Sequence, residues 1–159
     1  SVFVFGPEHP VGTYALCEKA DSGIIYNSSA GAEMAALGVP VIVAGEAWIR
    51  DKGFARDVSS PQEYFSTLDE LPFGTGMSED DRALAVRYAY HFFFRRMIPL
   101  PFIHRKTEAK FRVDIKDKAE LAEGVWPGLD VLCDGILRGT PFIYPAESLD
   151  TPFPGETTA

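Results

Sequence analysis

The chain has 159 residues, of which 46% are hydrophobic, so it is long enough to bury a core as a globular protein. Its 23 Asp and Glu outnumber its 15 Lys and Arg, which gives a formal net charge of −8. Nucleic-acid binding is built from clustered Lys and Arg, so this balance argues against a nucleic-acid partner. The sequence also holds no run of about 18 apolar residues, which excludes an encoded membrane span.

The cysteines indicate the redox compartment of the protein, and the first residues indicate whether the chain is complete. Cys17 and Cys133 lie far apart, and neither belongs to a cluster with metal-ligand spacing. We therefore predict no metal and no cofactor, and we interpret both cysteines as buried thiols in a reducing cytoplasm. The sequence starts at Ser1 without Met, inside an apolar stretch that looks like a strand. We expect a fragment of a longer protein.

The first 45 residues predict a βαβαβ unit. Thr13 resembles the N-cap of a first helix, and Gly38 suits the position after the end of a second one. Continuous apolar strands that alternate with helices indicate a parallel sheet covered on both faces, so the predicted fold class is α/β with a Rossmann-like sheet. The predicted strands are residues 1–5, 23–26 and 39–44, and the second helix runs from about Ala30 to Leu37.

The remainder predicts helices and irregular chain. A polar loop passes through Phe54, Ser60-Pro61 opens a helix that ends near Leu68, and Ser78 opens a longer helix to about Arg96. Prolines then interrupt every candidate element except a helix at 129–138. We predict three parts: the sheet-containing portion 1–103, a helical and irregular extension 104–139, and a mobile tail 140–159.

The turn after the second predicted strand is the main candidate site. Ligands bind outside the carboxyl ends of parallel strands, where a helix N-terminus directs free N–H groups at an anion. Asn27, Ser28 and Ser29 add donors there, Gly31 would permit close approach of a phosphate, and Glu33 could accept hydrogen bonds from sugar hydroxyls. The alternative interpretation is an ordinary capped helix with a solvated acid in its first turn.

Two groups of cations extend this candidate site. Arg50 and Lys52 follow the third predicted strand, where they could neutralise a leaving phosphate without a metal, or could instead pair with acids in a solvated loop. Arg95 and Arg96 follow three phenylalanines and could reach an anionic lipid-linked acceptor, although cations are common at any helix C-terminus.

Several segments resemble the capsule polysaccharide biosynthesis family of bacterial glycosyltransferases, which includes Kdo transferases and has the two-domain GT-B fold. The resemblance covers about residues 1–103 and is most specific around Asn27. Its segments are Tyr14-Ala15-Leu16, Ala20-Asp21, residues 26–33, residues 37–43, Gly53-Phe54, Tyr64-Phe65, residues 87–90 and 92–96, and Ile98-Pro99.

This resemblance implies the C-terminal half of a GT-B enzyme, preceded by another Rossmann-like domain that would supply the catalytic base. Asn27, Ser28 and Ser29 would hold the donor phosphate, and Glu33 would lie near the nucleotide. The implied activity is sugar transfer from a nucleotide-activated donor such as CMP-Kdo to a glycan or glycolipid acceptor. The implied location is the cytoplasm, with peripheral association at the inner face of the bacterial inner membrane.

The sequence also departs from the family. His, Tyr and Gly are usual where Trp48, Ile49 and Asp51 stand, so a polar contact of that loop is in doubt. Two alternatives therefore stay open: an enzyme like the nucleotide-sugar 2-epimerases, whose serine-glycine turn also precedes an acidic helix, and a non-catalytic module of polysaccharide assembly or export.

Overall fold

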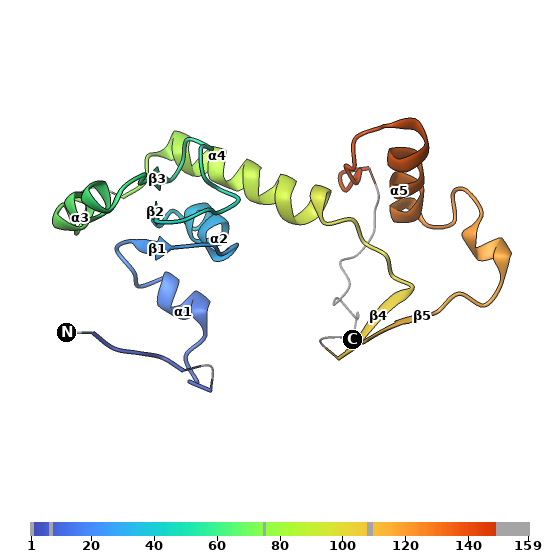
Figure 1. Ribbon diagram of the computed structural model, residues 1–159, viewed down its shortest axis with the longest axis horizontal. Helices are drawn as coiled ribbons and strands as arrows, with labels where there is room; N and C mark the ends of the chain where they lie inside the picture. Colours follow the sequence, from blue (N-terminus) through green and yellow to red (C-terminus); the bar gives the residue numbers. More distant parts are fainter. Residues whose placement is uncertain (1, 7, 75, 108–109, 149–159) are drawn as a thin grey trace. The chain divides into compact units, whose positions relative to one another are not determined.

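The computed structural model describes residues 2–6, 8–74, 76–107 and 110–148 (Figure 1). The chain forms two compact units, Ser1–Ala89 and Tyr90–Ala159. This division falls before the boundaries at 103 and 139 that the sequence suggested, and those domain limits stay predictions.

A three-stranded parallel sheet forms the centre of the first unit. Its order is β1 (Gly23–Ile25), β2 (Val41–Val43), β3 (Arg56–Asp57), so that β2 has a partner on each side. All three residues of β2 are buried, as expected for the middle strand of a sheet covered by other elements. The predicted α/β class, with a parallel sheet and flanking helices, is confirmed at this level.

The prediction of a first strand at residues 1–5 is wrong for residues 2–5, which are the part of it that the structure describes. Val2, Phe3 and Val4 are 90%, 78% and 90% exposed, and residues 2–6 form no strand. An apolar run becomes a strand only when another strand pairs with its backbone, and the described sheet ends at β1 on this side. Ser1 itself lies outside the described residues.

The third strand of the sheet is instead β3, which the sequence analysis placed in a polar loop. Ile42 pairs with Arg56 and Val43 pairs with Asp57, and the amide of Val58 continues the ladder by donating to the carbonyl of Val43 at 3.1 Å. A two-residue strand made of an arginine and an aspartate carries no hydrophobic period. Its pairing with β2 is therefore a product of tertiary structure.

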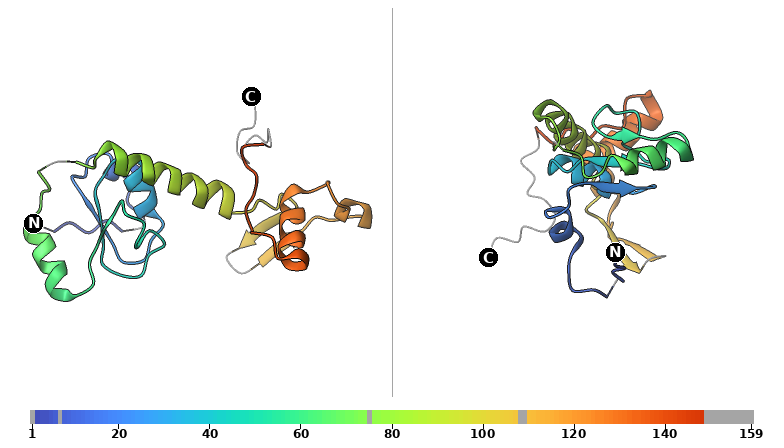
Figure 2. Two further views of the ribbon diagram at one scale, coloured as in Figure 1. Left: turned by 90° about the horizontal axis from the view of Figure 1, so that it is seen from above. Right: turned by 90° about the vertical axis from the view of Figure 1, so that its left-hand side faces the viewer.

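Helix α2 (Ala30–Ala36) covers one face of β1 and β2 (Figure 2). It approaches closely because two glycines leave room: a Cβ on Gly31 would lie 2.5 Å from Ile25 Cδ1, and one on Gly23 would lie 2.1 Å from Met34 Cε. The helix ends as predicted at Gly38, whose φ of +88° lets the amide of Val39 bond back to the carbonyl of Met34.

The other helices of the first unit follow the predicted capping signals in most cases. Ser60 caps α3 (Pro61–Asp69) by accepting a hydrogen bond from the Glu63 amide at 3.1 Å, and Ser78 accepts one from Asp81 ahead of α4 (Glu79–Tyr90). In α1 (Thr13–Cys17), however, the N-cap is Gly12, so Thr13 is the first helical residue and not the cap.

Unit 2 contains a β-hairpin that the sequence analysis missed. The π-helix η1 (His91–Arg96) continues the chain after α4, so the long predicted helix changes its hydrogen-bond period at His91. Antiparallel strands β4 (Ile103–Thr107) and β5 (Lys110–Val113) follow, then the 3₁₀ helix η2 (Lys118–Leu121) and α5 (Pro127–Arg138). No helix in the described ranges is long and apolar enough to cross a bilayer.

The prediction that both cysteines are buried is correct for one of them. Cys17 is buried as predicted, but Cys133 is exposed on α5. Within the predicted tail, Tyr144 is buried and its amide donates to the carbonyl of Arg95 at 2.7 Å, so residues 140–148 include a packed segment. The rest of that tail, 149–159, lies outside the described residues.

The start of α5 provides a test of packing in the second unit. A Cβ on Gly128 would lie 2.0 Å from the carbonyl oxygen of Pro99, whereas one on Gly135 of the same helix would meet only the ring of Phe142. We expect Gly128→Ala to lower the free energy of unfolding by about 1–3 kcal/mol, as overpacking against backbone does. Gly135→Ala is the matched control and should cost less, because the Phe142 ring can turn. Equal urea midpoints for the two variants would contradict this packing.

Candidate functional site

A cavity of about 850 Å³ opens at the carboxyl end of the sheet. Tyr26 follows β1, Gly45 follows β2 and Ser59 follows β3, and all three line it. This is the edge of a parallel sheet at which ligands bind, and the volume falls within the range of small-molecule sites. The complete lining is Ile24, Ile25, Tyr26, Ala44, Gly45, Glu46, Arg50, Val58, Ser59, Ser60, Pro61, Tyr64 and Phe65.

The wall of the cavity combines aromatic and hydroxyl groups. Tyr64 and Phe65 come from the first turns of α3, and their rings meet edge to face with centroids 5.5 Å apart. Ser59 and Ser60 lie at the N-terminus of the same helix, where the Ser59 amide donates to the Glu63 carboxylate at 2.7 Å and the Glu63 amide donates to Ser60 Oγ at 3.1 Å. Two backbone N–H groups at this end of the helix therefore already have protein partners. The apolar part of the wall suits a planar group such as a base, and the hydroxyl part suits a phosphate or a sugar.

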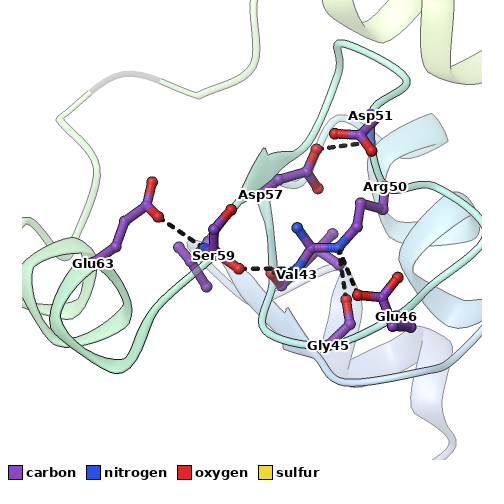
Figure 3. Close-up of polar contacts among 9 residues, drawn as sticks. Val43, Gly45, Glu46, Arg50, Asp51, Asp57, Ser59 and Glu63 are labelled. Atoms are coloured by element: carbon purple, nitrogen blue, oxygen red, sulfur yellow. Dashed lines mark hydrogen bonds and ion pairs between the residues drawn. The ribbon is translucent and has the colours of Figure 1, made fainter.

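Arg50 is the one predicted site residue that lines this cavity. Figure 3 shows its guanidinium group among the backbone carbonyls at the ends of the strands. Its Nε donates to the Gly45 carbonyl at 2.9 Å, and its Nη2 donates to the carbonyls of Val58 at 2.9 Å and Val43 at 3.4 Å. The side chain is only 16% exposed, and Glu46 lies 3.8 Å from Nε. Arg50 thus joins β2 to the segment after β3.

The turn between β1 and α2 takes the form of an ordinary cap. Ser28 Oγ accepts a hydrogen bond from the Ala30 amide at 3.2 Å, while the side chain of Ser29 makes no capping hydrogen bond although Ser29 is the N-cap residue. Asn27, Ser28 and Ser29 are exposed and stand outside the lining of the cavity, next to Tyr26. Gly31 is buried against Ile25, so its lack of a side chain serves helix packing.

Glu33 has a protein partner. The hydroxyl of Tyr14, on α1, donates to its carboxylate and so ties α1 to α2. This hydrogen bond, and then the negative charge of Glu33, raise the pKa of Tyr14 above its usual value of 10.0. The carboxylate faces α1 and therefore already has the kind of donor that a sugar hydroxyl would provide.

The loop that holds Lys52 is shaped by its backbone. Asp51 has a φ of 59°, a left-handed conformation that aspartate tolerates, and its amide donates to Asp57 Oδ2 at 2.7 Å. Lys52 is exposed and is absent from the lining of the cavity. Ile49, one of the departures from the family pattern, is 1% exposed and belongs to the core, whereas Trp48 is 68% exposed.

Three residues that line the cavity were not predicted as site residues from the sequence: Ser59, Tyr64 and Phe65. Ser60-Pro61 was predicted as the start of a helix. Nothing in the sequence placed that start beside β1 and β2, because β3 has no hydrophobic pattern from which it could be predicted. A recognised β3 would have put Ser59 at the same sheet edge as Tyr26 and Gly45.

Comparisons with models of protein families, with curated proteins and with solved structures found no match. The geometry at the carboxyl end of the sheet is therefore the basis on which a function can be argued.

The role of Arg50 can be tested by comparison with Lys52. We expect Arg50→Ala to lower the free energy of unfolding by about 2–3 kcal/mol, because partly buried carbonyls would lose a charged donor. Lys52→Ala, which removes an exposed cation from the same loop, should change it by less than about 0.5 kcal/mol. Thermal or urea denaturation measures both, and equal stability of the two variants would contradict the structural role of Arg50.

The contact between Tyr14 and Glu33 predicts a pH effect. The pKa of Tyr14 is higher in the folded state than in the unfolded state. The contact therefore contributes fully to the free energy of unfolding below pH 10, and this contribution is lost as pH rises through the folded-state pKa. Subtracting the tyrosinate absorbance titration of Tyr14→Phe from that of the unmodified chain should isolate a transition with its midpoint above 10. A midpoint at the ordinary tyrosine value would show that the hydrogen bond is absent in solution.

Proposed function

We propose that the first unit binds a nucleotide-activated sugar at the carboxyl end of its sheet, as the donor-binding part of a glycosyltransferase. The observation that carries the proposal is the cavity itself: parallel strands β1 and β2 and the N-terminus of α3 surround a space large enough for a nucleotide. The choice of a nucleotide-activated sugar as the ligand comes from the resemblance of residues 1–103 to capsule polysaccharide glycosyltransferases.

The chemistry of the lining suggests how the donor would lie. Tyr64 and Phe65 offer aromatic faces to the base, and the hydroxyls of Ser59 and Ser60 offer hydrogen bonds to ribose or phosphate. The leaving phosphate would extend past Tyr26 towards the exposed side chains of Asn27, Ser28 and Ser29. Donors placed where charge develops on a leaving phosphate lower the barrier without a metal ion.

The acceptor, a glycan or glycolipid, and the catalytic base are assigned to no residue of this chain. In a GT-B enzyme a second Rossmann-like domain would face this edge, so the proposal for this chain concerns donor binding. CMP-Kdo remains the suggested donor on the strength of the family resemblance.

A second candidate function has its own structural support. Arg50 is committed to three carbonyls, Ser28 to a cap and Glu33 to Tyr14, so these predicted ligand groups already have structural partners. That commitment favours a non-catalytic module of polysaccharide assembly that keeps the fold without nucleotide chemistry.

Nucleotide titration separates the two candidates. Isothermal calorimetry of the chain with CMP, UDP and CMP-Kdo should give saturable binding if the cavity holds a donor. Ser59→Ala should weaken it roughly tenfold, the effect of about one lost hydrogen bond to a charged group. Ser28→Ala combined with Ser29→Ala should weaken the binding of CMP but not that of cytidine, which has no phosphate.

Ser66→Ala is the matched control, because Ser66 lies on α3 and donates only to the Glu63 carbonyl in the same helix. Its affinity should equal that of the unmodified chain. Absence of heat with every nucleotide would reject donor binding and leave the non-catalytic module.

A further inference from the structure

Positive charge is concentrated in one part of this acidic chain. Residues 90–118 hold eight Lys and Arg against three Asp and Glu, whereas the whole chain holds 15 against 23. Within this stretch, the nine residues of strands β4 and β5 include four Lys and Arg, one His and no Asp or Glu. Half of the Lys and Arg of this stretch therefore lie in the hairpin strands of the second unit.

The pairing of the two strands sorts their side chains onto two faces. Ile103 pairs with Val113 and Arg105 pairs with Phe111, so these four side chains share one face. Phe111 is 64% exposed, Val113 59% and Ile103 38%. One face of the hairpin therefore presents three apolar side chains to solvent next to an arginine.

The remaining cations lie on the other face or at the bulge. His104 pairs across the strands with Arg112, and Asp114 forms an ion pair with Arg112 at 2.6 Å and lies 3.7 Å from His104 Nε2. Lys110 pairs with Thr107 beyond an irregularity in the ladder. Every residue of both strands is exposed, so both faces are accessible in this unit.

The base of the hairpin is anchored, while its strands gain little from the rest of the unit. Phe102 is buried with its ring 5.3 Å from that of Trp126, and the Asp114 amide donates to the Phe102 carbonyl at 2.8 Å. A two-stranded hairpin exposed on both faces is marginally stable in water. An additional surface that covers Phe111 and Val113 would stabilise it.

We propose that the β4–β5 hairpin is a peripheral membrane-binding element for an anionic lipid surface. Ile103, Phe111 and Val113 enter the headgroup region, and Arg105, on the same face, and Lys106, at the irregularity in the ladder, pair with lipid phosphates. Charge complementarity selects an anionic partner, since cations near an anionic bilayer each contribute to binding. The element does not depend on the donor site of the first unit.

A lipid surface fits the hairpin better than a nucleic acid does. Single-stranded nucleic acids are held by aromatic rings that stack on bases, and the apolar face of this hairpin offers one ring, Phe111, beside two aliphatic side chains. Aliphatic side chains gain from hydrocarbon and gain little from bases. A soluble polyanion is therefore the rival occupant that the experiment must distinguish.

Vesicle flotation of the full chain tests the proposal. Vesicles of phosphatidylcholine with about 30% phosphatidylglycerol should carry the chain at low salt, vesicles of phosphatidylcholine alone should not, and about 0.5 M NaCl should release it. Arg105→Gln combined with Lys106→Gln should weaken partition roughly 25-fold, at roughly fivefold for each cation. Phe111→Ser should weaken it roughly tenfold through lost apolar burial.

Matched controls come from the first unit. Phe3 is 78% exposed and lies outside the cavity, so Phe3→Ser removes a ring at least as exposed as Phe111, and Lys19→Gln combined with Arg87→Gln removes two exposed cations. These variants should float like the unmodified chain, and far-UV circular dichroism should show that all variants remain folded. Absence of flotation with anionic vesicles, or equal flotation of hairpin and control variants, would overturn the proposal. So would hairpin-dependent binding to a dT oligonucleotide without vesicle binding.

Discussion

The structure at the carboxyl end of the sheet depends on hydrogen-bond donors for the backbone carbonyls that lie at and just beyond the ends of the strands. Arg50 provides the donors, since its guanidinium group donates hydrogen bonds to the carbonyls of Val43, Gly45 and Val58. A planar group with several donors can bridge chain segments that diverge, which a lysine ammonium does less well. The rim of the cavity, including Glu46 and Ser59, is built around this group.

The same region shows how binding groups and structural groups compete for one set of side chains. Ser28, Glu33 and Arg50 have the chemistry of a phosphate and sugar site, yet each has a protein partner. A hydrogen bond to a ligand would add to these contacts or replace them. The part of the edge that is free for a ligand is the wall formed by Tyr26, Ser59 and the first turns of α3.

The two units differ in the surface that they offer. The first unit presents an open cavity lined by aromatic and hydroxyl groups, which suits a small molecule. The second presents an exposed basic hairpin with apolar side chains, which suits an extended anionic surface. The net charge of −8 conceals this second feature, because a sum over the chain carries no information about clustering.

Local signals in the sequence were enough to determine β1, α2, β2 and the starts of α3 and α4. Apolar runs, capping serines and Gly38 act within a few residues of themselves. The other features depended on pairing over longer distances. Residues 2–5 have the composition of a strand but no partner, whereas Arg56 and Asp57 have the composition of a loop and pair with β2.

The candidate site divides in the same way. The sequence placed Asn27, Ser28 and Ser29 after a buried strand, and they lie there. Only the tertiary structure decided that Gly31 faces the core, that Arg50 turns back onto backbone carbonyls, and that the start of α3 completes the cavity. Spacing along the chain reports which side chains are near a strand end, but the direction of each depends on the packing and hydrogen bonds of residues distant in sequence.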